Sequence, residues 1–130
     1  MTIVVGYIPT PEGSAALDAA VDQARLRSER LIVVNTGNHG DYSDPVFASG
    51  PDLDALQDQL TAIGLEHEVR QATAGRSAAE ELLSAAEEED AQLLVIGLRK
   101  RSPMGKLLLG STAQEVLLNA SCQVLAVKAS

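Results

Sequence analysis

The feature that most constrains this chain is a set of short apolar runs that are nearly continuous rather than alternating. They are rich in Val, Ile and Leu and occupy residues 2–7, 31–36, 92–96 and 123–128. A strand with one wet face alternates apolar and polar residues, whereas a strand covered on both faces is apolar throughout. The four runs therefore predict strands of a parallel sheet between helices. A fifth run, residues 66–71, alternates more and carries charges, so we place it at a sheet edge.

Helical patterns separate these runs, and the first two have recognisable ends. Thr10 is the expected N-cap of a helix over residues 11–28, because Pro11 then occupies the first helical position. A second helix is expected over residues 51–63, where leucines form one apolar stripe. Gly64 follows that stripe and is typical of a residue that ends a helix.

Two further helices are predicted from the spacing of a hydroxyl residue and a glutamate. Ser77 with Glu80 has the spacing of a capping box, and so has Thr112 with Glu115. The first pair opens a segment with Ala79, Leu82, Leu83 and Ala86, and the second precedes Val116, Leu117 and Leu118. We expect a third helix to begin after Ser77 and a fourth to begin after Thr112, the latter ending before Asn119.

The resulting order, β-α-β-α-β-α-β-α-β, predicts an α/β domain with a single open, doubly wound parallel sheet of five strands. Its 130 residues are enough for one sizeable core, and we assign residues 1–130 to one domain. In such sheets, ligands bind beyond the carboxyl ends of the strands. Two long connections are expected there: residues 37–49 are polar, and residues 97–109 are basic.

Charge and composition argue against several partners. Ten basic and eighteen acidic side chains give a net charge of −8. A negative net charge argues against a protein whose main role is to bind nucleic acid or an anionic membrane surface. No apolar run approaches the roughly 18 residues of a membrane span, and no basic region followed by an apolar stretch opens the chain. Cys122 is the single cysteine, so no intramolecular disulfide forms. We expect a cytoplasmic protein.

Residues 97–112 carry the most distinctive chemistry. A buried strand is expected to end at Gly97, and a helix to start near residues 110–112. Helix N-termini present unpaired N–H groups and a partial positive charge, so they bind anions. Residue types alone leave two interpretations open, a phosphate site or a solvated basic loop before an ordinary helix. Four of the ten basic side chains lie here: Arg99, Lys100, Arg101 and Lys106.

With these motifs in view, the chain resembles the universal stress protein (UspA) family. The family pattern is Gly, two residues, Gly, nine residues, then Gly with Ser or Thr, and Gly97, Gly110 and Ser111 match its spacing. Three expected strands fit the same template, at residues 3–7, 31–34 and 122–127. The resemblance implies an adenine nucleotide hydrolase-like fold with strand order 3-2-1-4-5. It also implies members that bind ATP or AMP, usually as dimers.

The resemblance assigns each part of a nucleotide to a part of the chain. The turn after the first strand and the backbone of Thr36, at the end of the second, would hold adenine and ribose. The basic segment and the helix start after it would hold the phosphates, with Mg²⁺, if present, bound mostly to phosphate oxygens. The predicted nucleotide-binding residues are Ile8, Pro9, Thr10, Thr36, Gly97, Arg99, Lys100, Gly105, Lys106, Gly110, Ser111 and Thr112.

Two positions depart from the family pattern. Lys100 stands where the family has its second glycine, so the loop path is expected to differ, although its ammonium could neutralise a phosphate. Ile8 replaces an acidic residue that nucleotide-binding members often carry, which removes a carboxylate contact near the base. These replacements keep an alternative open, a dimer that binds no nucleotide and acts through protein–protein contacts.

The resulting hypothesis is a cytoplasmic universal stress protein that binds ATP or AMP as a regulatory ligand. No evident general base lies near the basic segment, so we expect no fast enzyme, although slow hydrolysis could accompany binding. An adenylating or sulfur-transfer enzyme with a related sheet would need a Ser-Gly-Gly-rich loop after the first strand, and residues 7–12 lack one. Residues 123–128 form an expected edge strand, and relatives pair this strand between subunits, so we predict a homodimer.

The remaining chemically suggestive residues receive structural interpretations. His39 lies in a polar stretch with loosely spaced aspartates, which does not predict a metal site. His67, on the expected edge strand, should be exposed. Cys122 is interpreted as a small core residue. The acidic run at residues 87–90 ends the third helix, where it meets the negative end of the dipole, and we interpret it as solvated surface.

Overall fold

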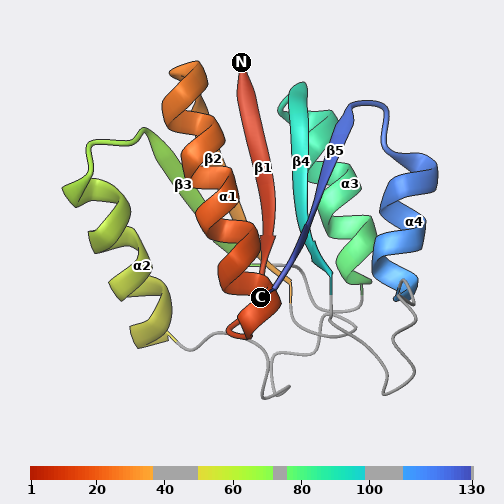
Figure 1. Ribbon diagram of the computed structural model, residues 1–130, viewed down its shortest axis with the longest axis horizontal. Helices are drawn as coiled ribbons and strands as arrows, with labels where there is room; N and C mark the ends of the chain where they lie inside the picture. The colour runs from red at the N-terminus through yellow and green to blue at the C-terminus, as the bar shows by residue number, and fades with distance from the viewer. Residues whose placement is uncertain (37–49, 72–75, 99–109, 130) are drawn as a thin grey trace.

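The computed structural model describes residues 1–36, 50–71, 76–98 and 110–129. Strands and helices alternate along these residues, as the sequence predicted (Figure 1). In chain order they are β1 (Thr2–Tyr7), α1 (Pro11–Arg27), β2 (Arg30–Asn35), α2 (Gly50–Ala62), β3 (His67–Gln71), α3 (Ala78–Glu88), β4 (Ala91–Leu98), α4 (Ser111–Asn119) and β5 (Gln123–Lys128).

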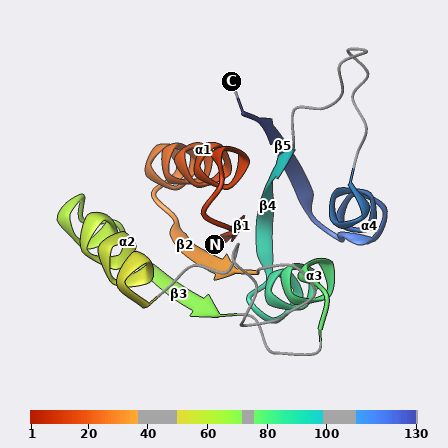
Figure 2. The same ribbon diagram turned by 90° about the horizontal axis from the view of Figure 1, so that it is seen from below.

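The five strands form one parallel sheet in the order β3-β2-β1-β4-β5. This order confirms the predicted 3-2-1-4-5 arrangement, and it puts β3 and β5 at the two edges. Figure 2 shows the helices distributed on both sides of the twisted sheet. Pairing of β5 with a second copy of the chain stays a prediction.

The core consists of two apolar clusters, one on each face of the sheet. Side chains of α1 and α2 contribute to one cluster, and side chains of α3 and α4 contribute to the other. We call these sides the α1–α2 face and the α3–α4 face. In β1, Ile3 and Val5 enter the first cluster and Val4 enters the second. Because alternate residues are buried on opposite faces, the central strands need apolar residues at successive positions.

The predicted starts of α1 and α3 are confirmed. Thr10 is the N-cap of α1, and its Oγ1 accepts a hydrogen bond of 3.1 Å from the N–H of Gly13. Pro11 occupies the first helical position, where a missing N–H costs nothing. Ser77 and Glu80 form the predicted capping box at the start of α3, with both hydrogen bonds at 3.1 Å.

Helix α4 starts within the predicted residues 110–112, but the predicted capping box of Thr112 and Glu115 is wrong. Its N-cap is Gly110, and the helix begins at Ser111, so Thr112 already lies within the first turn. A capping box needs its hydroxyl residue outside the helix, in extended backbone, and Gly110 holds that position with φ −68° and ψ 164°. The helix also continues through Asn119, one residue further than predicted, and the Nδ2 of that residue donates to the carbonyl of Glu115.

The acidic end of α3 is not simply solvated surface. The carboxylate of Glu89 receives one hydrogen bond of 2.8 Å from Arg30 and another of 2.8 Å from Arg70, which lie on neighbouring strands. Glu68 joins the same cluster through Arg30 and Arg70. Hydrogen bonds from Arg70 and then from Arg30 lower the pKa of Glu89 below its usual value. These two cations offset the unfavourable interaction between the acidic run and the negative end of the helix dipole. The spacing of residues in the sequence did not indicate this arrangement.

Two other structural interpretations can be compared with the described residues. His67 was expected to be exposed, but it is half-buried, and its Nδ1 lies 2.7 Å from the carbonyl oxygen of Leu65. Cys122 is half-buried just before β5 and packs against the α3–α4 cluster, in agreement with a small core residue. Burial raises the pKa of its thiol. Within the described residues, no helix is both long and apolar enough to cross a membrane.

Candidate functional site

The predicted site residues that the structure describes lie along one edge of the molecule. The carboxyl ends of parallel strands meet at the same edge of the sheet, and α3 and α4 also begin there (Figure 1). This carboxyl edge brings together eight of the predicted residues: Ile8, Pro9, Thr10, Thr36, Gly97, Gly110, Ser111 and Thr112. The other four fall outside the described residues: Arg99, Lys100, Gly105 and Lys106.

The turn between β1 and α1 is held by local hydrogen bonds. The N–H of Thr10 donates to the carbonyl of Ile8 at 2.8 Å, and the carbonyl of Thr10 accepts from Ser14 at 2.9 Å. The Thr10 side chain caps Gly13 as described above. Pro9 is exposed, while Ile8 is half-buried and offers an apolar side chain at this turn. These hydrogen bonds therefore hold the turn in a defined conformation at the carboxyl edge.

The end of β2 is joined to the end of β1. The N–H of Thr36 donates to the carbonyl of Tyr7 at 3.2 Å, and Thr36 is 6% exposed. Its neighbour Asn35 is fully buried. Because the Thr36 N–H is engaged within the sheet, any contact between adenine and the Thr36 backbone would be made by the carbonyl oxygen.

The start of α4 is open. Gly110, Ser111 and Thr112 are exposed, and no side chain caps the first turn. A Cβ built on Gly110 would meet no atom within 4 Å, so the N-cap is not enclosed by described residues. The first turn also contains no acidic side chain. Exposed N–H groups, two hydroxyl donors and the positive end of the helix dipole make this helix start a good anion site.

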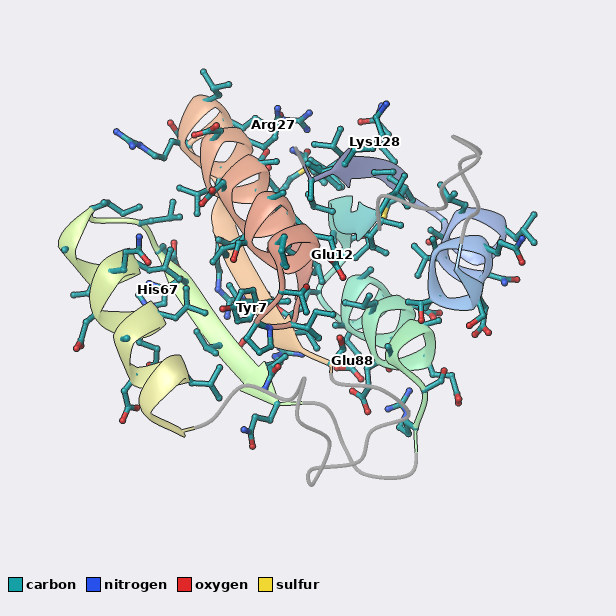
Figure 3. All side chains as sticks on the ribbon, turned by 60° about the horizontal axis from the view of Figure 1, so that its bottom comes forward. Tyr7, Glu12, Arg27, His67, Glu88 and Lys128 are labelled. Carbon is teal, nitrogen blue, oxygen red and sulfur yellow. The ribbon has the colours of Figure 1, made fainter. Side chains whose placement is uncertain are left out.

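Glu12 is a residue of this edge that sequence reasoning did not single out. It lies in the first turn of α1, and Figure 3 places it between α1 and β4. Its backbone packs on Gly97: a Cβ on that glycine would overlap the Glu12 carbonyl oxygen and lie 2.8 Å from the carbonyl carbon. An acidic residue in the first turn of a helix is a recognisable local signal. The contact between Glu12 and β4 has no such local signal in the sequence.

The comparisons with known proteins agree with this arrangement. The sequence model of the universal stress protein family matches residues 1–128. The chain belongs to the universal stress protein family. A family member from Mycolicibacterium smegmatis is 44% identical over 126 residues, which cover 97% of this chain and 96% of that protein.

Solved structures of other universal stress proteins share the fold. One from Archaeoglobus fulgidus has a TM-score of 0.79 and 32% identity, and the match covers 98% of each chain. Another structure of a universal stress protein from Archaeoglobus fulgidus was solved in complex with dAMP. It has a TM-score of 0.65 and 25% identity, again over 98% of each chain. The sheet order and these matches confirm the adenine nucleotide hydrolase-like fold of the family.

Proposed function

We propose that this universal stress protein binds an adenine nucleotide, ATP or AMP, as a regulatory ligand in a stress response. The observation that carries the proposal is the exposed, uncapped start of α4 at the carboxyl edge, the edge at which β1 and β2 also end. Family membership supports it, since a relative with 25% identity was solved with dAMP.

The phosphate side of the site would be the start of α4. The N–H groups of its first turn have no partners within the helix, and the Ser111 and Thr112 hydroxyls can donate further hydrogen bonds. Gly110 leaves open space for a phosphate oxygen to approach the backbone. The basic side chains between β4 and α4 would add positive charge in a chain whose net charge is −8.

The base and ribose side would be the turn after β1 together with Thr36. Ile8 is half-buried and apolar, so it suits the flat face of a base better than a charged group. The carbonyl of Thr36 can accept a hydrogen bond from the adenine amino group. Guanine carries a carbonyl at that ring position and would bring two acceptors together, so the site should prefer adenine.

The proposed activity is binding rather than rapid catalysis. A general base must lie within hydrogen-bond reach of the proton that it removes. None of the eight predicted site residues that the structure describes is a carboxylate, a histidine or a cysteine. The bound nucleotide would act by stabilising the protein state that prefers it.

The test is a calorimetric titration of the nucleotide-stripped wild-type protein with AMP and ATP, with GMP as the matched base control. We expect saturable, micromolar binding of an adenine nucleotide and weaker binding of GMP. At a ligand concentration of about 100 times Kd, the free energy of unfolding should rise by about 2.7 kcal/mol. The absorbance of the purified protein at 260 nm is a first screen, because two tyrosines and no tryptophan absorb little in the ultraviolet.

A folded wild-type protein that binds neither AMP nor ATP would contradict the proposed function. The alternative would then be a universal stress protein that acts through protein–protein contacts alone. The replacements at Ile8 and Lys100 would explain such a loss.

A further inference from the structure

Two glycines at the carboxyl edge are in contact with backbone rather than with open space. A Cβ on Gly13 would overlap the carbonyl oxygen of Ile8 and lie 2.9 Å from its carbonyl carbon. A Cβ on Gly97 would overlap the carbonyl oxygen of Glu12 in the same way. Backbone atoms cannot rotate away as the tip of a side chain can, so neither position accepts a side chain without movement of a main-chain segment.

Gly97 faces α1 and not α4. Along β4, Leu93 and Val95 enter the α1–α2 cluster, whereas Leu94, Ile96 and Leu98 enter the α3–α4 cluster. Gly97 continues the first series, which agrees with its contact with Glu12 in α1. The start of α4 lies on the other face. The missing side chain of Gly97 therefore makes room for α1, and not for a phosphate bound at the start of α4.

Gly6, Gly64 and Gly110 do not share this feature. A Cβ on Gly6 would meet only the end of the Leu82 side chain, at 2.9 Å, and Gly64 and Gly110 meet no atom within 4 Å. Of Gly6, Gly13, Gly64, Gly97 and Gly110, only Gly13 and Gly97 are thus approached closely by backbone atoms. Both contacts involve the segment from Ile8 to Gly13.

We propose that Gly13 and Gly97 are positioning residues of the nucleotide site, an inference that rests on the proposed function. Gly13 lets the turn after β1 fold back onto α1, and Gly97 lets the first turn of α1 sit on the end of β4. Helix α4 begins at the same edge of the sheet at which β4 ends. The two glycines therefore set the base and ribose side of the site relative to its phosphate side.

The test compares Gly97→Ala with Ile3→Ala in the otherwise unchanged protein. Ile3 is fully buried in the same α1–α2 cluster, but it lies at the amino end of β1, away from the site. Both substitutions should lower the thermal unfolding temperature. At a temperature where both proteins are folded by circular dichroism, Gly97→Ala should weaken AMP binding by about tenfold or more, because misplaced binding groups lose affinity. Ile3→Ala should bind AMP within about twofold of wild type.

The outcomes separate this inference from the proposed function. Wild-type protein that binds AMP, together with folded Gly97→Ala protein that binds it equally well, would overturn the positioning role and leave the proposed function standing. Equal losses in Gly97→Ala and Ile3→Ala would also overturn it, because stability would then explain both. If wild-type protein binds neither AMP nor ATP, the proposed function fails first and the positioning role fails with it.

A second measurement covers the case in which Gly97→Ala does not fold. Amide hydrogen exchange of the free wild-type protein reports whether the turn is held in place before any ligand arrives. The N–H groups of Thr10, Gly13 and Ser14, all hydrogen-bonded within the turn, should exchange nearly as slowly as those of β1. Exchange as fast as in an unstructured segment would show that the two glycines position nothing.

Discussion

Helices α3 and α4 pack side by side on the same face of the sheet and begin at the same edge, yet their first turns differ. The first turn of α3 is closed by its own side chains, because Ser77 and Glu80 exchange two hydrogen bonds with the backbone. Glu81 adds a second acidic residue there. The first turn of α4 has Gly110 as its cap, no side-chain hydrogen bond and no acidic residue.

The difference shows how one structural element serves two purposes. Side chains that satisfy the first N–H groups of a helix stabilise it, but they occupy the donors that an anionic ligand would need. Acidic residues near those donors stabilise the helix further and repel a phosphate. The start of α3 is therefore built for stability, and the start of α4 retains the donors and the positive potential that a nucleotide phosphate requires.

Gly110→Asp would make the start of α4 resemble that of α3, and we expect the largest effect from it. The new carboxylate would cap the helix and repel the phosphate. Affinity for AMP should fall by about 100-fold or more, since a like charge in a binding site costs several kcal/mol. The free energy of unfolding should rise only slightly, by about 0.3 kcal/mol, because Asp is a somewhat better N-cap than Gly. Calorimetric titration and urea unfolding measure the two effects.

Gly110→Asn is the matched control for this change. Asn caps a helix about as well as Asp but carries no charge. It should give a similar gain in stability with a clearly smaller loss of AMP affinity. Undiminished AMP binding by Gly110→Asp protein would mean that the phosphate does not lie at the start of α4.

Ser77→Ala tests the other helix start in the comparison, that of α3. Loss of the Ser77 hydroxyl removes the hydrogen bond to the Glu80 N–H, and the free energy of unfolding should fall by about 1 kcal/mol. Affinity for AMP should stay within about twofold, because distant sites act independently. Ser84→Ala is the control, since the Ser84 hydroxyl donates to the exposed side chain of Glu88 within the same helix and does not cap it. A loss no larger in Ser77→Ala than in Ser84→Ala would show that the cap contributes nothing.

Most of the fold could be predicted from the sequence because the signals are local and agree with one another. Apolar runs without alternation indicated a parallel sheet, and Thr10 and Ser77 have the residue types and spacings of helix starts. The N-cap of α4 was wrongly predicted to be Thr112 because Gly110, Ser111 and Thr112 are all acceptable N-caps. The path of the chain that enters the helix decides among them, and residue types do not report that path.

The shared edge of the candidate site residues was predictable from the sequence, but their contacts were not. Parallel topology alone brings the ends of β1, β2 and β4 to one edge, so the general location followed from element order. The packing of Glu12 on Gly97 joins residues far apart in the sequence, and no local pattern indicates it. The same holds for Glu89 with Arg30 and Arg70, where the sequence showed only an acidic run.

The smallest expected effect concerns the negative charge of Glu80 in the first turn of α3. The first turn of α4 contains no acidic residue. Hydrogen bonds from the Ser77 N–H and hydroxyl lower the pKa of Glu80 below its ordinary value of 4.5. Because the pKa is lower in the folded protein, the charge stabilises the fold above pH 4.5, and this stability is lost as the pH falls through the folded-state pKa. Glu80→Gln keeps a capping side chain without the charge.

Urea unfolding of wild-type and Glu80→Gln protein at several pH values would measure this contribution. Wild-type protein should be the more stable of the two near neutral pH, and the difference should shrink below pH 4.5. Glu89, whose pKa is also lowered, titrates in both proteins and therefore cancels from the comparison. A difference that persists unchanged into strong acid would mean that the hydrogen-bonding shape of the Glu80 side chain, and not its negative charge, closes the start of α3.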